Sequence, residues 1–239
     1  MSAEVDAVAG LVIGAIAVDG LRHVRRRADL ILASLPLVLA VHQLIEVVVW
    51  WGVEGDVASS VAHVAVYAYL LVAFGLPLLV PPAVAVLEPD GWRRRLMERL
   101  GVAGAFVALV LLAGVVTGPV GAVDGGYHIT YHARLFDGGA LTVVYVMATL
   151  GCLLASSHRK IVAFGALNLG AVAALAWLTV SGFVSLWCAW AAVTSVVIAV
   201  HLRTVDRQAR GRGARGLDWR RPRKAVPFGP GRSRILPTR

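Results

Sequence analysis

The stretch LILASLPLVLAVHQLIEVVVWW, which runs from Leu30 to Trp51, decides the fold of this chain. It contains no lysine or arginine, and it is long enough to cross a bilayer as a helix, which takes about 20 apolar residues. His42, Gln43 and Glu46 nevertheless lie within it. A charged side chain costs at least ~2.5–3.5 kcal/mol in the bilayer core on insertion scales, so we expect these three residues to face other helices rather than lipid.

The composition is that of a membrane protein along most of the chain. Hydrophobic residues form 58% of the 239 residues and charged residues only 15%, against about 25% charged residues in soluble domains. The sequence therefore predicts an all-α fold, a polytopic transmembrane bundle of seven helices within residues 1–203. Residues 204–239, rich in Arg, Gly and Pro, are expected to form a basic, disordered cytoplasmic tail. The expected spans are Val5–Val18, Leu30–Trp51, Ser59–Val80, Leu100–Val120, Gly139–Ser156, Ile161–Val180 and Val184–His201.

Basic residues are distributed unevenly between the two sides of this bundle. With seven spans the connections alternate between sides, and Arg134 is the only one of 23 lysines and arginines on one of them. The positive-inside rule then places the N-terminus outside and the C-terminus in the cytoplasm. Glu4 and Asp6 precede the first apolar run, which favours an N-out anchor over a cleaved signal peptide. We expect a multi-pass protein of the plasma membrane.

Two polar pairs are expected to meet in the outer half of the bundle. His42 and Glu46 are four residues apart on one helix, and His63 and Tyr67 are four apart on the next. At ~1.5 Å per residue, the antiparallel helices place Glu46 level with His63, and His42 level with Tyr67. We therefore predict an outward-facing polar pocket. Its further members are Gln43, Tyr145, Ser185 and Cys188.

Three interpretations of this polar cluster remain open. The first is structural, with Glu46 neutral or sharing a proton in hydrogen bonds between helices. The second is a zinc-like metal site, because His42, Glu46 and His63 supply the imidazole and carboxylate ligands that such ions accept. The third is a proton-coupled or small-molecule site built on the Glu46 carboxylate.

The longest connection between spans, Gly121–Gly138, is glycine-rich at both ends, and loops of this length are often functional or mobile. If it is helical, His128 and His132 lie on one face and would cap the pocket or add metal ligands. The alternative is an interfacial aromatic belt shared with Tyr127 and Tyr131. The outer belt is also expected to include Trp50, Trp51, Trp177 and Trp187.

Three segments resemble an uncharacterised family of small bacterial multispanning membrane proteins. They are LASLPLVLAVHQLIEVVVWWGVEG (Leu32–Gly55), the SHRK turn (Ser157–Lys160) and FVSLWCAWAAVTSVVIAVH (Phe183–His201). The first and last contain the motifs LPLxxxxHQxIExxVW and WCxxAAxxS. The resemblance implies seven helices with an inward HQxxE face, and it implies no activity. This chain opens Met-Ser-Ala-Glu where the family opens Met-Cys-Phe-Ser, so any role of that cysteine is missing here.

Two comparisons bear on cofactors. Retinal is excluded because a Schiff base needs a buried lysine, whereas Lys160 lies at a membrane boundary and Lys224 lies in the tail. The chain is also similar to alkaline-ceramidase-type hydrolases, which have seven spans and a histidine-bound zinc beside an acidic residue and a serine. Their HxxxH motif in the last helix is missing, because that span holds only His201.

We expect a membrane protein that binds a small ligand or ion in the polar pocket, with no catalytic residue defined. The alternatives are a metal-dependent intramembrane hydrolase of lipid and a structural subunit of a membrane complex. The expected partners are the lipid bilayer and, for the basic tail, anionic inner-leaflet lipid. Topology accounts for the net charge of +9, so no nucleic acid is expected. Gly-x-x-x-Gly pairs at Gly10 and Gly114 allow close helix packing, within the bundle or in a homo-oligomer.

Overall fold

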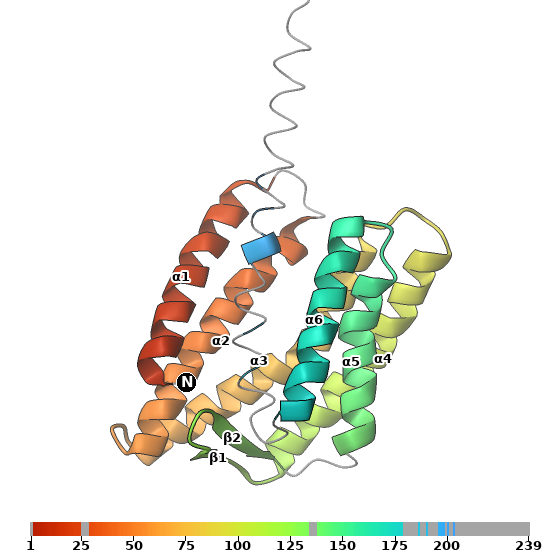
Figure 1. Cartoon of the computed structure of the whole chain (residues 1–239). Coiled ribbons are helices and arrows are strands. Elements are labelled where there is room, and N and C mark those ends of the chain that lie inside the picture. Colours follow the sequence, from red (N-terminus) through yellow and green to blue (C-terminus); the bar gives the residue numbers. More distant parts are fainter. Residues whose placement is uncertain are drawn as a thin grey trace, which may run out of the picture.

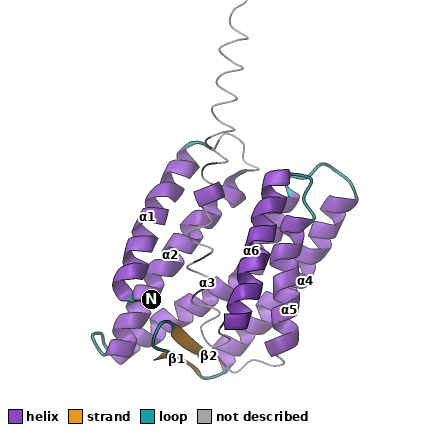
Figure 2. Ribbon diagram, viewed as in Figure 1, coloured by secondary structure: helices purple, strands orange, loops and turns teal. Residues whose placement is uncertain are grey.

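The structure, a computed structural model, describes residues 2–24, 29–133 and 138–178, together with the helical residues 186, 190, 196–198, 200 and 203. Within the three continuous ranges the chain forms six helices and one β-hairpin (Figure 2). The helices are α1 (Ala3–Arg22), α2 (Leu30–Glu54), α3 (Ser59–Ala85), α4 (Trp92–Thr117), α5 (Gly138–Leu154) and α6 (Arg159–Leu178). The hairpin consists of β1 (Val120–Asp124) and β2 (Ile129–Ala133).

Consecutive helices run in alternating directions and pack side by side (Figure 1). α1 packs on α2, α2 on α3, α3 on both α4 and α5, and α5 on α4 and α6. The hairpin lies at one end of the bundle, near the N-terminus (Figure 1). The turns from α3 to α4 and from α5 to α6 lie at the opposite end, and the helices that follow them, α4 and α6, carry arginines in their first turns (Figure 1).

Four of the described helices are long and apolar enough to cross a membrane: α2, α3, α4 and residues Arg159–Trp177 of α6. α5 is a shorter apolar helix of 17 residues. The mainly helical class is confirmed, and the helices start or end within eight residues of the expected spans. α1, α2 and α3 extend beyond the expected spans at their C-terminal ends, and α4 begins eight residues earlier than expected because the charged segment Trp92–Arg99 is helical.

Small residues set the distance between α1 and α2. A Cβ atom built on Gly10 would lie 2.8 Å from Leu44 Cγ and 3.2 Å from the Ala40 carbonyl oxygen, so a larger residue there would force Leu44 or the helices to shift. Gly14 faces the Ala40 methyl group, at 3.7 Å from an equivalent Cβ. The first Gly-x-x-x-Gly pair therefore packs against α2 of the same chain.

α3 contains Pro77 within its helix, and a side chain from α5 compensates for it. Proline has no N–H group, so the carbonyl of Ala73, four residues earlier, loses its partner within the helix. The hydroxyl of Tyr145 donates a hydrogen bond to that carbonyl oxygen at 2.7 Å. Tyr145 thus repairs the proline break and joins α3 to α5.

The connection between α4 and α5 folds as a hairpin, where a long loop was expected. β1 pairs antiparallel with β2, with Ala122 opposite Tyr131. Gly126 provides the turn with a positive φ of 87°, and its N–H donates to Asp124 Oδ1 at 2.6 Å. The β-branched and aromatic residues of Ile129–Ala133 suit a strand. Ile129 is fully buried, so this strand packs on the helices.

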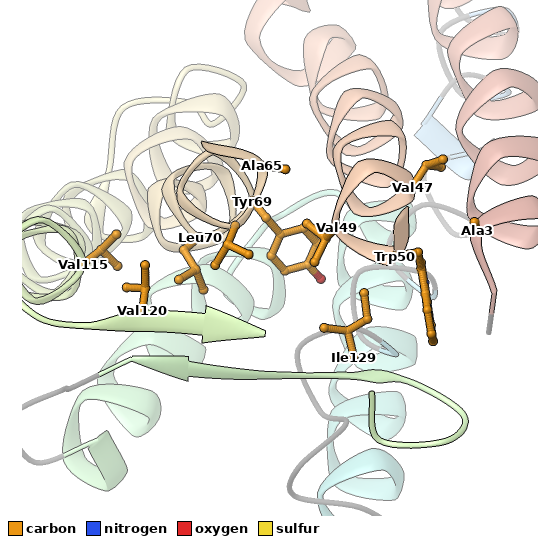
Figure 3. Packing of buried hydrophobic residues seen from close by; sticks show 11 residues of the cluster. Ala3, Val47, Val49, Trp50, Ala65, Tyr69, Leu70, Val115, Val120 and Ile129 are labelled. Carbon is orange, nitrogen blue, oxygen red and sulfur yellow. The ribbon is translucent and has the colours of Figure 1, made fainter. Parts of the chain in front are cut away.

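The hairpin closes the end of a core formed by α2, α3 and α4. Figure 3 shows Tyr69 between α2 and α3, with Val120 and Ile129 of the hairpin directed toward the helices. Leu70 and Val115 continue this core between α3 and α4. The hairpin is therefore held by apolar contacts as well as by its own backbone hydrogen bonds.

Two described residues of the C-terminal part contact the ends of α1, α2 and α3. Ile198 packs with Leu32 and Ala83. The Arg203 guanidinium donates to Asp19 Oδ2 at 2.6 Å, and this hydrogen bond lowers the pKa of the Asp19 carboxyl. Residue 203 and the end of α1 consequently lie at the same end of the bundle.

Candidate functional site

The HQxxE face of α2 is turned into the protein. His42, Gln43 and Glu46 are each at most 1% exposed, whereas Val41 and Leu44 beside them are exposed. The spacing of one and four residues keeps the three on one broad side of a helix. The expectation that this face points inward is confirmed, although the three side chains have different partners.

Gln43 belongs to a hydrogen-bond network between α1 and α2. Its Nε2 donates to Asp6 Oδ1 at 3.2 Å, and the indole Nε1 of Trp50 donates to Asp6 Oδ2 at 2.8 Å. Asp6 is completely buried in α1 and Trp50 is 4% exposed. Hydropathy predicts neither role, because Asp6 lies at the edge of the first expected span, before the apolar run, and Trp50 is expected to be an interfacial anchor. The structural interpretation therefore applies to Gln43, Asp6 and Trp50.

His42 has its partner on α3. Its Nε2 lies 3.1 Å from the carbonyl oxygen of Tyr69, and a carbonyl only accepts hydrogen bonds, so Nε2 carries the proton. Because a charged imidazole is costly at this depth, the ring is neutral and Nδ1 is an acceptor. Nδ1 is buried and has no hydrogen-bond partner among the described residues. Such a group calls for a physical explanation, for example a bound molecule.

Three aromatic rings stack from α2 to the hairpin. The His42 ring lies 3.9 Å from the Tyr69 ring between centroids, at 30° between planes. The Tyr131 ring of β2 lies 4.1 Å from the Tyr69 ring between centroids, at 6° between planes. The Tyr131 hydroxyl is also 3.4 Å from Glu46 Oε1, as donor. The hairpin thus covers the His42–Glu46 face, and Tyr131 contacts residues of both α2 and α3.

The expected pairing with His63 and Tyr67 is wrong. His63 is exposed, and its ring lies 5.7 Å from that of Tyr67 on its own helix. The residue of α3 that meets His42 is Tyr69. The predicted partner of His42, Tyr67, is only two residues from the observed partner, Tyr69. Two residues correspond to about 200° of rotation around a helix, so Tyr67 lies on another face of α3.

The expected metal ligands do not gather. Across the described ranges, no group of three or more His, Cys, Asp or Glu side chains is placed to hold a metal ion. His63 lies away from the buried face that carries His42 and Glu46. His128 is buried at the hairpin turn and His132 is exposed, because the segment is a strand rather than a helix.

Of the remaining predicted pocket residues, Tyr145 has the structural role described above. Ser185 and Cys188 lie outside the described residues, so their place in the pocket stays a prediction.

A second polar cluster, which the sequence reasoning missed, joins two turns at the basic end. Glu88 Oε1 accepts hydrogen bonds from Ser156 Oγ at 2.5 Å and from the Ser157 N–H at 2.7 Å. Arg93 donates to the carbonyl oxygens of Ala155 and Ser156. Burial alone would raise the pKa of Glu88, but these hydrogen bonds and the nearby His158 together lower it. The only signal of this cluster in the sequence was a carboxylate, Glu88, just beyond the end of an apolar run.

The fold and the site together define a helical membrane protein with a buried polar cluster under a β-hairpin. Residues 1–214 match the family of unknown function DUF6629, and the chain therefore belongs to this family. No curated protein and no solved structure matches the chain.

Proposed function

We propose that this protein binds a small cationic or hydrogen-bond-donating ligand, such as an amine, between His42 and Glu46 beneath the hairpin. The observation that most supports this proposal is the buried Nδ1 of His42, an acceptor without a hydrogen-bond partner among the described residues. Glu46 lies one helical turn further on the same face and adds a carboxylate. Two acceptors at one place favour a ligand that donates hydrogen bonds.

The location of the site supports a functional role over a purely structural one. Ionisable residues within membrane-spanning helices are costly and are typical of ligand, ion or proton sites. Interhelical hydrogen bonds use Gln43 Nε2 through Asp6, but they use neither His42 Nδ1 nor Gln43 Oε1. The structural explanation thus covers one part of the HQxxE face and leaves the other for a ligand.

The topology of the proposal follows from the charge distribution. Seven spans, an external N-terminus and a cytoplasmic C-terminus would place the arginine-bearing starts of α4 and α6 inside and the hairpin outside the plasma membrane. The ligand would then enter from the external side when the hairpin moves away from Tyr69. The basic tail would lie along anionic lipid of the inner leaflet.

The alternative functions have less support. A zinc-dependent lipid hydrolase would need several ligands on one ion, and the described residues hold no such cluster. A structural subunit would need an interface on an outer face, and of the two Gly-x-x-x-Gly pairs that could form one, the pair Gly10 and Gly14 already packs against α2.

The proposal is tested by thermal unfolding of the full chain in lipid nanodiscs. Ammonium, methylammonium and ethanolamine chlorides are each compared with sodium chloride at constant ionic strength. A ligand that binds only the folded state at 100 times its Kd stabilises it by about 2.7 kcal/mol. We expect a saturable rise in Tm for at least one amine, and its loss in His42→Leu and Glu46→Gln.

His63→Ala is the matched control, because His63 is an exposed histidine on the neighbouring helix. It should keep the full response to the amine. The proposal is wrong if no amine acts differently from sodium, or if the response survives in a folded His42→Leu variant.

A further inference from the structure

A groove between α3 and α4, far from the hairpin, has the shape of a lipid-binding site. Its volume is about 400 Å³, within the range of roughly 300–1,000 Å³ that is usual for small-molecule sites. Its walls are mostly apolar and include Leu78, Pro82, Val86, Gly101, Val102 and Ala105. Leu78 and Val102 are exposed on two helices that are apolar enough to cross a membrane, and the exposed Val86 directly follows the first of them, so acyl chains are their natural contact.

One end of this groove opens into a charged hollow. Arg94 and Glu98 line both the groove and an adjoining hollow of about 530 Å³, which Asp90, Gly91 and Arg95 complete. Arg94 is held between two carboxylates, 2.7 Å from Asp90 Oδ1 and 3.2 Å from Glu98 Oε1. The hollow therefore presents two guanidinium groups and two carboxylates side by side.

The length of the groove fits one leaflet. From Arg94 to Ala105 the axis of α4 rises ~16 Å, which is less than the ~20 Å thickness of one leaflet with its headgroups. An amphiphile whose headgroup lay in the hollow would thus extend its chain along the groove toward the bilayer centre. Gly101 and Ala105 have small side chains and leave room for that chain between the helices.

We infer that this groove binds a glycerophospholipid with an amine-bearing zwitterionic headgroup, of the phosphatidylethanolamine class. The phosphodiester would accept hydrogen bonds from Arg95 and Arg94. The primary ammonium would donate hydrogen bonds to Asp90 and Glu98. Arg94 pairs with both carboxylates, so a phosphodiester bound to Arg94 would compete with Asp90 and Glu98 for its guanidinium. A primary ammonium on the same headgroup would replace Arg94 beside the carboxylates, whereas a headgroup with phosphate alone supplies no such cation and a quaternary ammonium cannot donate hydrogen bonds.

The experiment is native mass spectrometry of the full chain in mild detergent. Phosphatidylethanolamine, phosphatidylcholine and phosphatidylglycerol with identical acyl chains are added at equal concentrations. We expect one phosphatidylethanolamine to be retained with at least fivefold higher occupancy than either of the others. Ala105→Leu, which places a larger side chain in the groove, should lower that occupancy at least fivefold, and Glu98→Gln should abolish the preference over phosphatidylglycerol.

Ala113→Leu is the control, because Ala113 is exposed on α4 and does not line the groove. It should bind lipid as the unaltered chain does. The inference is overturned by equal retention of the three lipids, by preferential retention of phosphatidylglycerol, or by Ala105→Leu and Ala113→Leu having the same effect. The site is independent of His42 and Glu46, so either proposal can fail alone.

Discussion

The ring of Tyr131 on the hairpin is parallel to the ring of Tyr69 on α3, with 4.1 Å between centroids and 6° between planes. The Tyr69 ring also contacts the His42 ring, with 3.9 Å between centroids. A strand residue that hydropathy would leave at the membrane surface is thereby placed over the most polar part of α2. The stack links the hairpin to the candidate ligand site.

Removing the Tyr131 ring should loosen this cover more than removing its hydroxyl. Tyr131→Ala loses a stacked aromatic ring, and large-to-small aromatic substitutions cost about 3–5 kcal/mol when fully buried, so we expect about 2–3 kcal/mol at this half-buried site. Tyr131→Phe loses only the long hydrogen bond to Glu46, and we expect about 1 kcal/mol or less. Unfolding in detergent, followed by tryptophan fluorescence, compares the two; equal losses would contradict the role of the stack.

Asp6 should be essential to the contact between α1 and α2. Asp6→Ala leaves the buried donors of Gln43 and Trp50 without their acceptor, at a cost of about 1–3 kcal/mol for each unsatisfied group. In an Asp6→Ala background, Trp50→Phe should cost less than it does alone, because the indole donor is already unpaired. Glu4→Gln, two residues away and exposed, is the control and should leave the unfolding midpoint unchanged.

Tyr145 and Pro77 should show strong coupling in a double-mutant cycle. Tyr145→Phe removes the hydroxyl that donates to the Ala73 carbonyl in place of the missing proline N–H, and we expect about 1–2 kcal/mol of destabilisation. In a Pro77→Ala chain the new N–H of residue 77 bonds to that carbonyl, so Tyr145→Phe should become nearly neutral. Additive effects of the two substitutions would contradict this explanation.

Glu88 should make stability depend on acidity. Its folded-state pKa is lowered from 4.5, so its contribution is complete above pH 4.5 and is lost as the pH falls through the folded-state value. The difference in Tm between the unaltered chain and Glu88→Gln should therefore shrink below pH 4.5. Thermal unfolding between pH 3 and pH 7 measures it, with the exposed Glu54→Gln as control. A difference that grows on acidification would have the wrong sign.

The helices could be predicted from the sequence because apolar runs of membrane length leave few alternatives. α2 begins at Leu30 and α3 at Ser59, where the apolar runs begin. Pro81 and Pro82 do not end α3, which continues to Ala85, since neighbouring groups can satisfy freed carbonyls inside a membrane bundle. The hairpin was missed because its strands are five residues each and lie in a segment judged by its length and glycines.

The site was predicted only in part, for a geometrical reason. Polar residues in an apolar run are expected to face inward, and His42, Gln43 and Glu46 are indeed buried. Their partners depend on helix rotation and on a hairpin distant in sequence. His63 and Tyr67 were expected to be the partners because they have the same spacing of four residues as His42 and Glu46. The buried face of α3 instead contains Ala65, Val66, Tyr69 and Leu70.

The most direct test of the ligand site is the nitrogen NMR spectrum of His42. The full chain is labelled with ¹⁵N-histidine in nanodiscs, and the His42 signals are assigned by comparison with His42→Gln. The account predicts a protonated Nε2 and an unprotonated Nδ1 whose resonance shifts saturably with methylammonium and does not respond to sodium. A protonated Nδ1, or a resonance that ignores every amine that stabilises the protein, would contradict it.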